Sequence, residues 1–173
     1  MAFDCFTGTL TSNTGTGTQA ITGVGFQPKL VLFFGTYATA DGNQADGIQL
    51  IGAAESSTTR GVVTGLGEDA LSGSVDSYRK QLNNKCIETL STTGTVVISA
   101  DLDSLDADGF TLDWTNGSGA RLINYIPLGG ADLINVDLRS ITTKTSTGTQ
   151  AYTGVGFQPG QNSADRDRKS TRL

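Results

Sequence analysis

The sequence of 173 residues contains no histidine, only two cysteines and only one tryptophan. Without histidine, the chain lacks the commonest general base of active sites and the commonest protein ligand of transition metals. Serine and threonine are plentiful, but no Gly-x-Ser-x-Gly motif or Ser–Lys pair marks a nucleophile. Cys5 and Cys86 belong to no pairing motif, so we expect two buried free thiols in a reducing compartment. These absences predict a protein that is not an enzyme and requires no cofactor.

Long apolar runs and an excess of positive charge are missing too. No stretch approaches the roughly 18 apolar residues of a membrane span, and the start "MAFDCFTGTL" lacks the features of a signal peptide. The formal net charge is −5, from 12 basic and 17 acidic side chains. An acidic domain repels phosphate groups, so we expect neither nucleic acid nor a membrane as a partner.

The sequence does contain an internal repeat. Residues 16–28 read "TGTQAITGVGFQP" and residues 147–159 read "TGTQAYTGVGFQP", with Ile21 against Tyr152 as the one difference. The offset of 131 residues is the length of an ordinary domain rather than of a short solenoid repeat. We therefore predict a tandem array, with a complete repeat over 1–133 and the start of a second, truncated repeat over 134–159. Residues 134–159 should form strands equivalent to those of residues 3–25.

The last segment, residues 160–173, departs from the repeat. The first copy continues after Pro28 into the apolar "KLVLFF", whereas the second continues after Pro159 into a polar, charged segment. Its end, "DRKSTRL", can be encoded by GATCGGAAGAGCACACGTCTG and resembles a translated sequencing adapter. We interpret residues 160–173 as a non-native read-through tail of a metagenomic fragment. Without its four basic and two acidic residues, 8 basic and 15 acidic side chains remain, a net charge of −7.

Residues 3–126 have the texture of β-structure. Threonine and glycine are frequent, and short apolar or alternating runs are separated by Gly, Asn and Asp. The predicted strands are residues 3–10, 19–25, 29–34, 47–53, 60–65, 95–99, 109–115 and 120–126. The last two flank "NGSG", so we predict that they form a hairpin. Residues 74–90 break the pattern and are expected to hold a helical turn or a long surface loop. This pattern predicts an all-β chain, an antiparallel β-sandwich with a jelly-roll-like order.

Two features are candidate binding sites. Four carboxylates lie within eight residues, and hard cations such as Ca²⁺ bind several oxygen ligands; they are Asp101, Asp103, Asp106 and Asp108. Their spacing departs from the Asp-x-Asp-x-Asp-Gly loop, and Asp-Gly pairs also form turns, which is the interpretation that we favour. Trp114, if exposed, could stack on a sugar, but it is in phase with Phe110 and Leu112, which favours a core position.

Several segments resemble a repeated β-domain of uncharacterised tailed-bacteriophage structural proteins. The resemblance is carried by "GVGFQPKLVLFF", "DGFTLDWT" and "INYIPLGGADL", and covers most of residues 16–159. It implies a non-enzymatic virion protein, made in the bacterial host cytoplasm, that is a tail or fibre-associated repeat or a surface decoration. Its partners would be other virion proteins or copies of itself, with a host surface glycan as a further candidate. The alternative is a carbohydrate-binding or adhesive module of a surface or secreted repeat protein.

Overall fold

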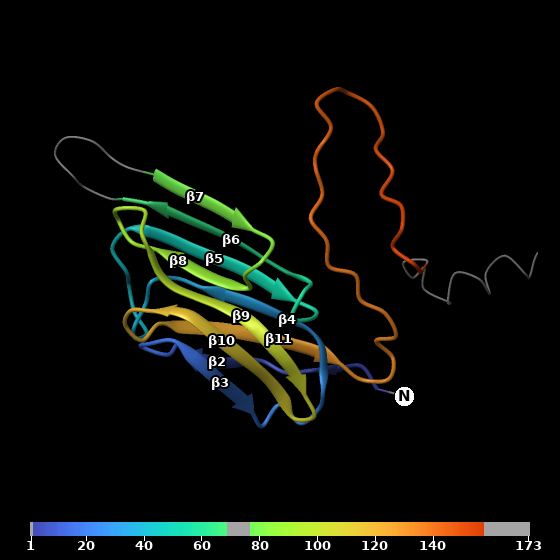
Figure 1. Cartoon of the computed structure of the whole chain (residues 1–173), viewed down its shortest axis with the longest axis horizontal. Helices are drawn as coiled ribbons and strands as arrows, with labels where there is room; N and C mark the ends of the chain where they lie inside the picture. Colours follow the sequence, from blue (N-terminus) through green and yellow to red (C-terminus); the bar gives the residue numbers. More distant parts are fainter. Residues whose placement is uncertain (1, 69–76, 158–173) are drawn as a thin grey trace, which may run out of the picture. The chain divides into compact units, whose positions relative to one another are not determined.

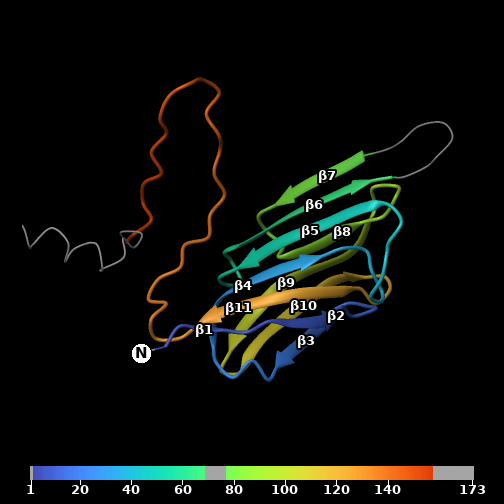
Figure 2. The ribbon, with the colours of Figure 1, turned by 180° about the vertical axis from the view of Figure 1, so that it is seen from behind.

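The computed structural model describes residues 2–68 and 77–157, and in this part of the chain the fold is all-β. The strands form two antiparallel sheets, and the described residues contain no helix. It follows that no helix of the described part could cross a membrane. Figures 1 and 2 show the two sheets from opposite sides, one layer in front of the other.

Each sheet has a simple order. The seven-stranded sheet, called sheet A, has the order β1-β11-β4-β5-β6-β7, and β2 also pairs with β11. Its strands are β1 (Asp4–Cys5), β2 (Gly8–Thr11), β4 (Pro28–Gly35), β5 (Gly47–Ala54), β6 (Arg60–Gly67), β7 (Ser77–Leu82) and β11 (Leu122–Gly129). The four-stranded sheet, called sheet B, has the order β3-β10-β9-β8. Its strands are β3 (Gly17–Thr22), β8 (Ile87–Leu90), β9 (Val96–Asp106) and β10 (Gly109–Gly117).

The core lies between the two sheets and follows from the alternation of side chains along the strands. In β5, Leu50 is buried while its neighbour Ile51 is exposed on the outer face of sheet A. Aromatic rings connect the layers, because Phe110 of sheet B contacts two rings of sheet A edge to face. Its ring centroid lies 5.7 Å from that of Phe33 and 5.2 Å from that of Tyr125. The sheets therefore share one apolar core.

The predicted hairpin between residues 109–115 and 120–126 is wrong. Strand β10 pairs with β3 and β9 in sheet B, whereas β11 pairs with β1, β2 and β4 in sheet A. The connection crosses from one sheet to the other, and a Cβ on Gly117 would lie 2.5 Å from the carbonyl oxygen of Gly15. The hairpin partner of β10 is β9, joined through Ala107 and Asp108. Alternation identifies a strand but does not identify the strand with which it pairs.

The expectation for residues 74–90 is also wrong in the part that the structure describes. Residues 77–82 form β7, the edge strand of sheet A, and residues 87–90 form β8, the edge strand of sheet B. The polar residues between them carry the chain from one sheet to the other. Residues 74–76 lie outside the described residues.

The chain divides into two compact units, one ending at Ile141 and one beginning at Thr142. This division lies eight residues beyond the boundary at 133 that the sequence suggests. After Gly129 no described residue belongs to a strand, so residues 134–157 do not form the strands expected of a second repeat. A strand needs a partner for its backbone groups, and the partners of β1, β2 and β3 come from residues after Lys29 in the first unit. The proposed tail, residues 160–173, lies outside the described residues.

Candidate functional site

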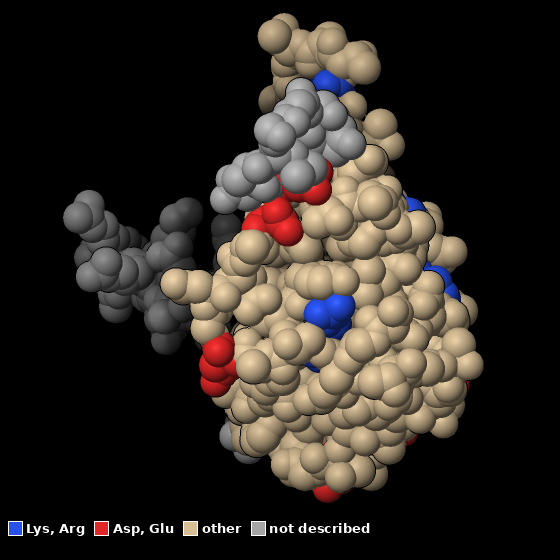
Figure 3. Space-filling view, turned by 90° about the vertical axis from the view of Figure 1, so that its left-hand side faces the viewer, with Lys and Arg blue, Asp and Glu red and all other residues tan. Residues whose placement is uncertain are grey.

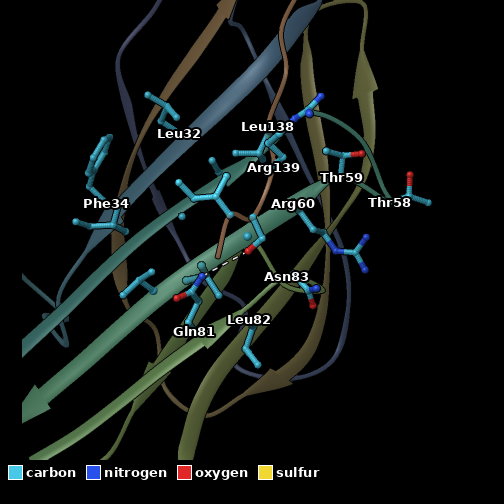
Figure 4. A pocket seen from close by; sticks show the side chains of 18 residues that line it. Leu32, Phe34, Thr58, Thr59, Arg60, Gln81, Leu82, Asn83, Leu138 and Arg139 are labelled. Carbon is cyan, nitrogen blue, oxygen red and sulfur yellow. Dashed lines mark hydrogen bonds between the residues drawn. The ribbon is translucent and has the colours of Figure 1, made fainter. Parts of the chain in front are cut away.

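A pocket of about 610 Å³ lies on the outer face of sheet A. Its floor consists of residues of β4, β5, β6 and β7, among them the exposed Ile51 and Val63, and one wall is the segment that ends the first unit (Figure 4). The apolar lining is Leu32, Phe34, Ile51, Ala53, Val62, Val63, Leu82, Leu138 and Ile141, and the polar lining includes Thr58, Thr59, Arg60, Gln81, Asn83, Arg139 and Ser140.

The wall of the pocket is formed by residues 133–141, here called the covering segment. Lys29 Nζ donates a hydrogen bond to the carbonyl oxygen of Leu133 at 2.6 Å. The backbone N–H of Leu138 donates to Glu55 Oε2 at 2.9 Å, and Gln81 Nε2 lies 3.5 Å from Ser140 Oγ (Figure 4). These contacts join the segment to β4, to the residue after β5 and to β7. The segment therefore lies across the outer face of sheet A.

The pocket combines apolar surface with hydrogen-bonding groups at its rim. Ile51, Val63 and Ile141 remain 48%, 53% and 52% exposed. Arg139 forms an ion pair with Asp137, which raises the pKa of this guanidinium further above its usual range. The lining contains no histidine, cysteine or carboxylate. This chemistry suits contact with another apolar surface.

Asp101, one of the four calcium candidates, lies in an ion network between the sheets. It accepts from Arg60 Nε of β6 at 3.0 Å and from Lys85 Nζ at 2.8 Å. Arg60 Nε also lies 3.0 Å from the carbonyl oxygen of Asn84, and Lys85 Nζ lies 3.0 Å from Thr115 Oγ1. Both oxygens of Asp101 thus have cationic partners, and the network joins sheet A to β9 of sheet B.

The other three carboxylates are not brought together with Asp101. Asp103 is exposed on β9, and Asp106 accepts from the hydroxyls of Ser104 and Thr111 at the end of the β9–β10 hairpin. Asp108 accepts from the backbone N–H groups of Gly23 and Gly25 at 3.0 and 2.5 Å. Across residues 2–68 and 77–157, no group of three or more His, Cys, Asp or Glu side chains is arranged to hold a metal ion.

Trp114 lies in the core, the position that its alternation with Phe110 and Leu112 predicts. Its side chain is 1% exposed, and its indole Nε1 donates to Gln19 Oε1 of β3 at 2.8 Å. A buried indole cannot stack on a sugar, so Trp114 is not a glycan contact in this conformation. The structure gives it a different role, because it fixes β3 to β10 through Gln19.

Two further buried polar groups lie where the sheets meet. Glu88 of β8 is 3% exposed and pairs with Lys80 of β7, with 2.6 Å between Oε1 and Nζ. Both thiols are free, but the expected burial is wrong for Cys5, which is exposed near the start of the chain. The thiol of Cys86 lies in the core and donates to the carbonyl oxygen of Ala100 at 3.4 Å. Burial, together with the nearby carboxylate of Asp101, raises the pKa of Cys86 far above its usual range. The thiol is therefore protonated and unreactive at neutral pH.

Charged side chains are sparse on one end of the molecule. Figure 3 shows this end with uncharged residues over most of the area and with basic and acidic side chains scattered among them. On the part of this face that is described, the charges do not gather into a patch of one sign. This face offers no concentrated field that would attract a polyanion.

The chain matches no protein-family model, and no curated protein or solved structure is significantly similar to it.

Sequence reasoning missed both the pocket and the inter-sheet ion network. Arg60 and Asp101 are 41 residues apart, and the covering segment reaches Glu55 over 83 residues. No local pattern marks such pairs, because they become neighbours only once the order of strands in the sheets is known.

Proposed function

We propose that this chain is a non-enzymatic structural repeat of a bacteriophage virion, associated with a tail or fibre or displayed as a surface decoration. In this proposal the antiparallel sheets form a β-sandwich that recurs about every 131 residues along a tandem array. Its partners are copies of the same repeat and other virion proteins. The jelly-roll-like order expected from the sequence has less support, since β4 to β7 are neighbours in sequence order within one sheet.

The observation that supports this proposal best is the repeat in the sequence, in which three matched pairs of glycines also share a positive φ, although residues 142–157 form no strand. Three glycines of the first copy have positive φ: Gly17 at 118°, Gly23 at 83° and Gly25 at 87°. Their counterparts 131 residues later have φ of 124°, 81° and 77°, at Gly148, Gly154 and Gly156. Matched positive φ angles at glycines in both copies support a tandem array.

The polar chemistry of the complete unit also supports a structural role. The charged groups Arg60, Lys85 and Asp101 join the two sheets to each other, and Lys80 and Glu88 do the same at the sheet edges. Repeated β-domains of this kind suit a structural protein of the virion surface.

The carbohydrate-binding alternative loses the residue on which it depended. Trp114, the one tryptophan, is buried and bonded to Gln19. We therefore keep the structural repeat as the proposed function.

The test is the protein composition of purified particles. Phage particles would be isolated by density gradient from the material that encodes the chain, and digested with trypsin. We expect the peptides 30–60 and 122–139, each bounded by a lysine or arginine, at a ratio to the capsid protein that survives repeated purification. Peptides confined to the cell lysate and lost from the particles would contradict the proposal.

A further inference from the structure

We propose that the outer face of sheet A is the surface by which two copies of this chain bind each other, face to face and related by a two-fold axis. The proposal rests on the part of the proposed function that gives copies of the repeat as partners, and it assigns the surface of contact. The apolar pocket on this face is then covered by the same face of a second copy.

Strand β4 is apolar on both of its faces, which the shared core alone does not explain. Its residues 30–34 read "LVLFF", a run typical of a strand that is buried on both sides. Val31 and Phe33 are fully buried in the core, whereas Leu32 and Phe34 alternate with them and line the pocket on the outer face. Sheet B covers only the inner face of sheet A, so the outer side of β4 is available to another apolar surface.

The register of sheet A aligns outward-facing residues of six strands in one row across the sheet. Each member lies directly opposite the next one in the neighbouring strand, so their side chains share one face. From β2 to β7 the row, here called the central row, consists of Thr9, Asn124, Phe34, Ile51, Val63 and Gln81. With neighbouring strands about 4.8 Å apart, the row is about 24 Å long. It contains no charged residue, and its central Ile51 and Val63 are about half exposed.

The outer face of sheet B has the charged side chains that are usual for a strand surface in water. Asp103 of β9 is exposed and follows the buried Leu102, and Asp113 of β10 follows the buried Leu112. This alternation of apolar and acidic residues is typical of a sheet with one solvated face. The two outer faces therefore differ, and the uncharged face of sheet A is the one suited to contact with another protein surface.

The chemistry of the central row fits a second copy of itself. In a dimer whose two-fold axis runs along the row, every residue of the row lies opposite its own copy. Phe34, Ile51 and Val63 then contact apolar side chains. The amides of Asn124 and Gln81 lie opposite amides, which both donate and accept hydrogen bonds. A charged residue on the axis would repel its copy, and copies of a chain with a net charge of −5 approach most readily where charge is absent.

The shape of the face is also self-complementary about this axis. The covering segment lies on one side of the central row, where Leu32 and Ala53 line the pocket with it (Figure 4). On the other side of the row is a second hollow of about 420 Å³, whose lining includes Gln49 and Leu122. A two-fold rotation about the row places the covering segment of each copy over this hollow of the other. Ile141 of the covering segment is 52% exposed and supplies an apolar side chain for the contact.

A cross-link between identical positions tests the two-fold axis in the full chain. The test variant carries Cys5→Ser and Ile51→Cys, and the control carries Cys5→Ser and Ala20→Cys, which lies at an exposed position of β3 in sheet B. A short bismaleimide is used, because packed sheets lie about 10 Å apart and a disulfide cannot span that distance. We expect a cross-linked dimer that grows with concentration in the test variant and a monomer in the control. A test variant without a cross-link, or equal cross-linking of both variants, would overturn the proposal.

A charge placed on the axis tests the same contact in a second way. In Val63→Lys, two like charges face each other in the dimer, so we expect about tenfold weaker dimerisation or more in sedimentation equilibrium. The matched control is Ala20→Lys, which adds the same charge at an exposed strand position of sheet B and should dimerise like the original chain. Because Val63 is 53% exposed, we expect its variant to remain folded, and the cross-link is an independent test if it does not. Equal dimerisation of the two lysine variants would refute the assigned surface.

The failure of this proposal can be distinguished from the failure of the proposed function. The cross-link and the lysine variants report only on the contact between two copies, whereas the particle composition reports only on the virion. Particles that contain a chain without this dimer contact would retain the structural repeat and remove this interaction.

Discussion

At the scale of single residues, the approach of β3 to β10 depends on a position that has no side chain. Gly109 has a φ of +148°, and its missing Cβ leaves room for the carbonyl oxygen of Ile21. Alanine there would combine a disfavoured backbone conformation with a clash against backbone atoms, which cannot move aside as a flexible side chain can. We expect Gly109→Ala to lower the free energy of unfolding by about 3 kcal/mol or more.

The matched control is Gly67→Ala in β6. A Cβ at Gly67 would meet no atom within 4 Å, and its φ is not in the positive region. We expect this variant to stay within about 0.5 kcal/mol of the original in urea unfolding. Equal stability of the two variants would show that β3 does not pack on β10 as described.

The buried thiol of Cys86 makes stability depend on alkaline pH. Burial raises the pKa of this thiol in the folded chain, whereas the unfolded chain has the ordinary value of about 8.5. Above about pH 8.5 the Cys86 thiol therefore keeps its proton in the folded chain, whereas it loses its proton in the unfolded chain. The contribution of Cys86 to the free energy of unfolding is complete below about pH 8.5. Above that pH, the free energy of unfolding falls by up to about 1.4 kcal/mol per pH unit.

Urea unfolding of the original chain and of Cys86→Ala, measured between pH 7 and pH 9.5, checks this dependence. Alanine at this position leaves a small cavity, so the variant should be less stable at pH 7, but its stability should fall less steeply above pH 8.5. Parallel curves for the two proteins would mean that Cys86 is accessible to solvent in the folded chain.

At the scale of elements, Asp101 joins the two sheets and is the most informative of the four carboxylates. Its side chain is 21% exposed, and it pairs with Arg60 and Lys85, which are 15% and 19% exposed. Asp101→Asn leaves two cations without a counter-charge in a partly screened position, so we expect a loss of about 1–3 kcal/mol. Asp103→Asn, two residues along β9 and exposed, is the control and should cost less than about 0.5 kcal/mol. A similar loss in both variants would mean that β9 tolerates no change of charge, whatever its partners.

The same carboxylates give a prediction for calcium. Asp101, Asp106 and Asp108 accept hydrogen bonds or ion pairs from Lys, Arg, hydroxyl or backbone donors of the chain itself. A calcium ion would have to displace these donors, so we expect the same melting temperature in millimolar CaCl₂ and in EDTA. A calcium-dependent rise of several degrees, abolished by Asp106→Asn, would contradict this.

Strand β10 shows which features of the fold could be predicted from the sequence and which could not. Alternation identified β10 and placed Trp114 in the core, because the side-chain period of a strand is visible in the sequence. The partner of β10 could not be predicted in the same way. The Asn-Gly turn signal at 116–117 suggested β11, yet this connection crosses between the sheets. Pairs such as Arg60 with Asp101 are not predictable for the same reason, since they depend on the order of strands.

At the scale of the whole chain, the repeat and the compact units have different boundaries. The repeat offset of 131 residues suggested a first domain that ends near 133, whereas the contacts place its end at Ile141. The difference is the covering segment, which is held by Lys29, Glu55 and Gln81 of the first unit. The covering segment is therefore part of the first compact unit.

Truncation decides between the two boundaries. A chain that ends at Ile141 should unfold with the stability of the first unit in the full chain, whereas one that ends at 133 loses the half-buried Leu138 and its hydrogen bond to Glu55. Burial of part of a leucine and one hydrogen bond to a carboxylate together amount to about 2 kcal/mol, which is the expected loss in urea unfolding.

The shorter chain should also bind a hydrophobic dye more strongly, because Ile51 and Val63 become more exposed without the covering segment. Leu138→Ala in the longer chain should show about half of the loss. Equal stability of both truncated chains would instead place the domain boundary at 133, and the covering segment would then belong to the second copy of the repeat.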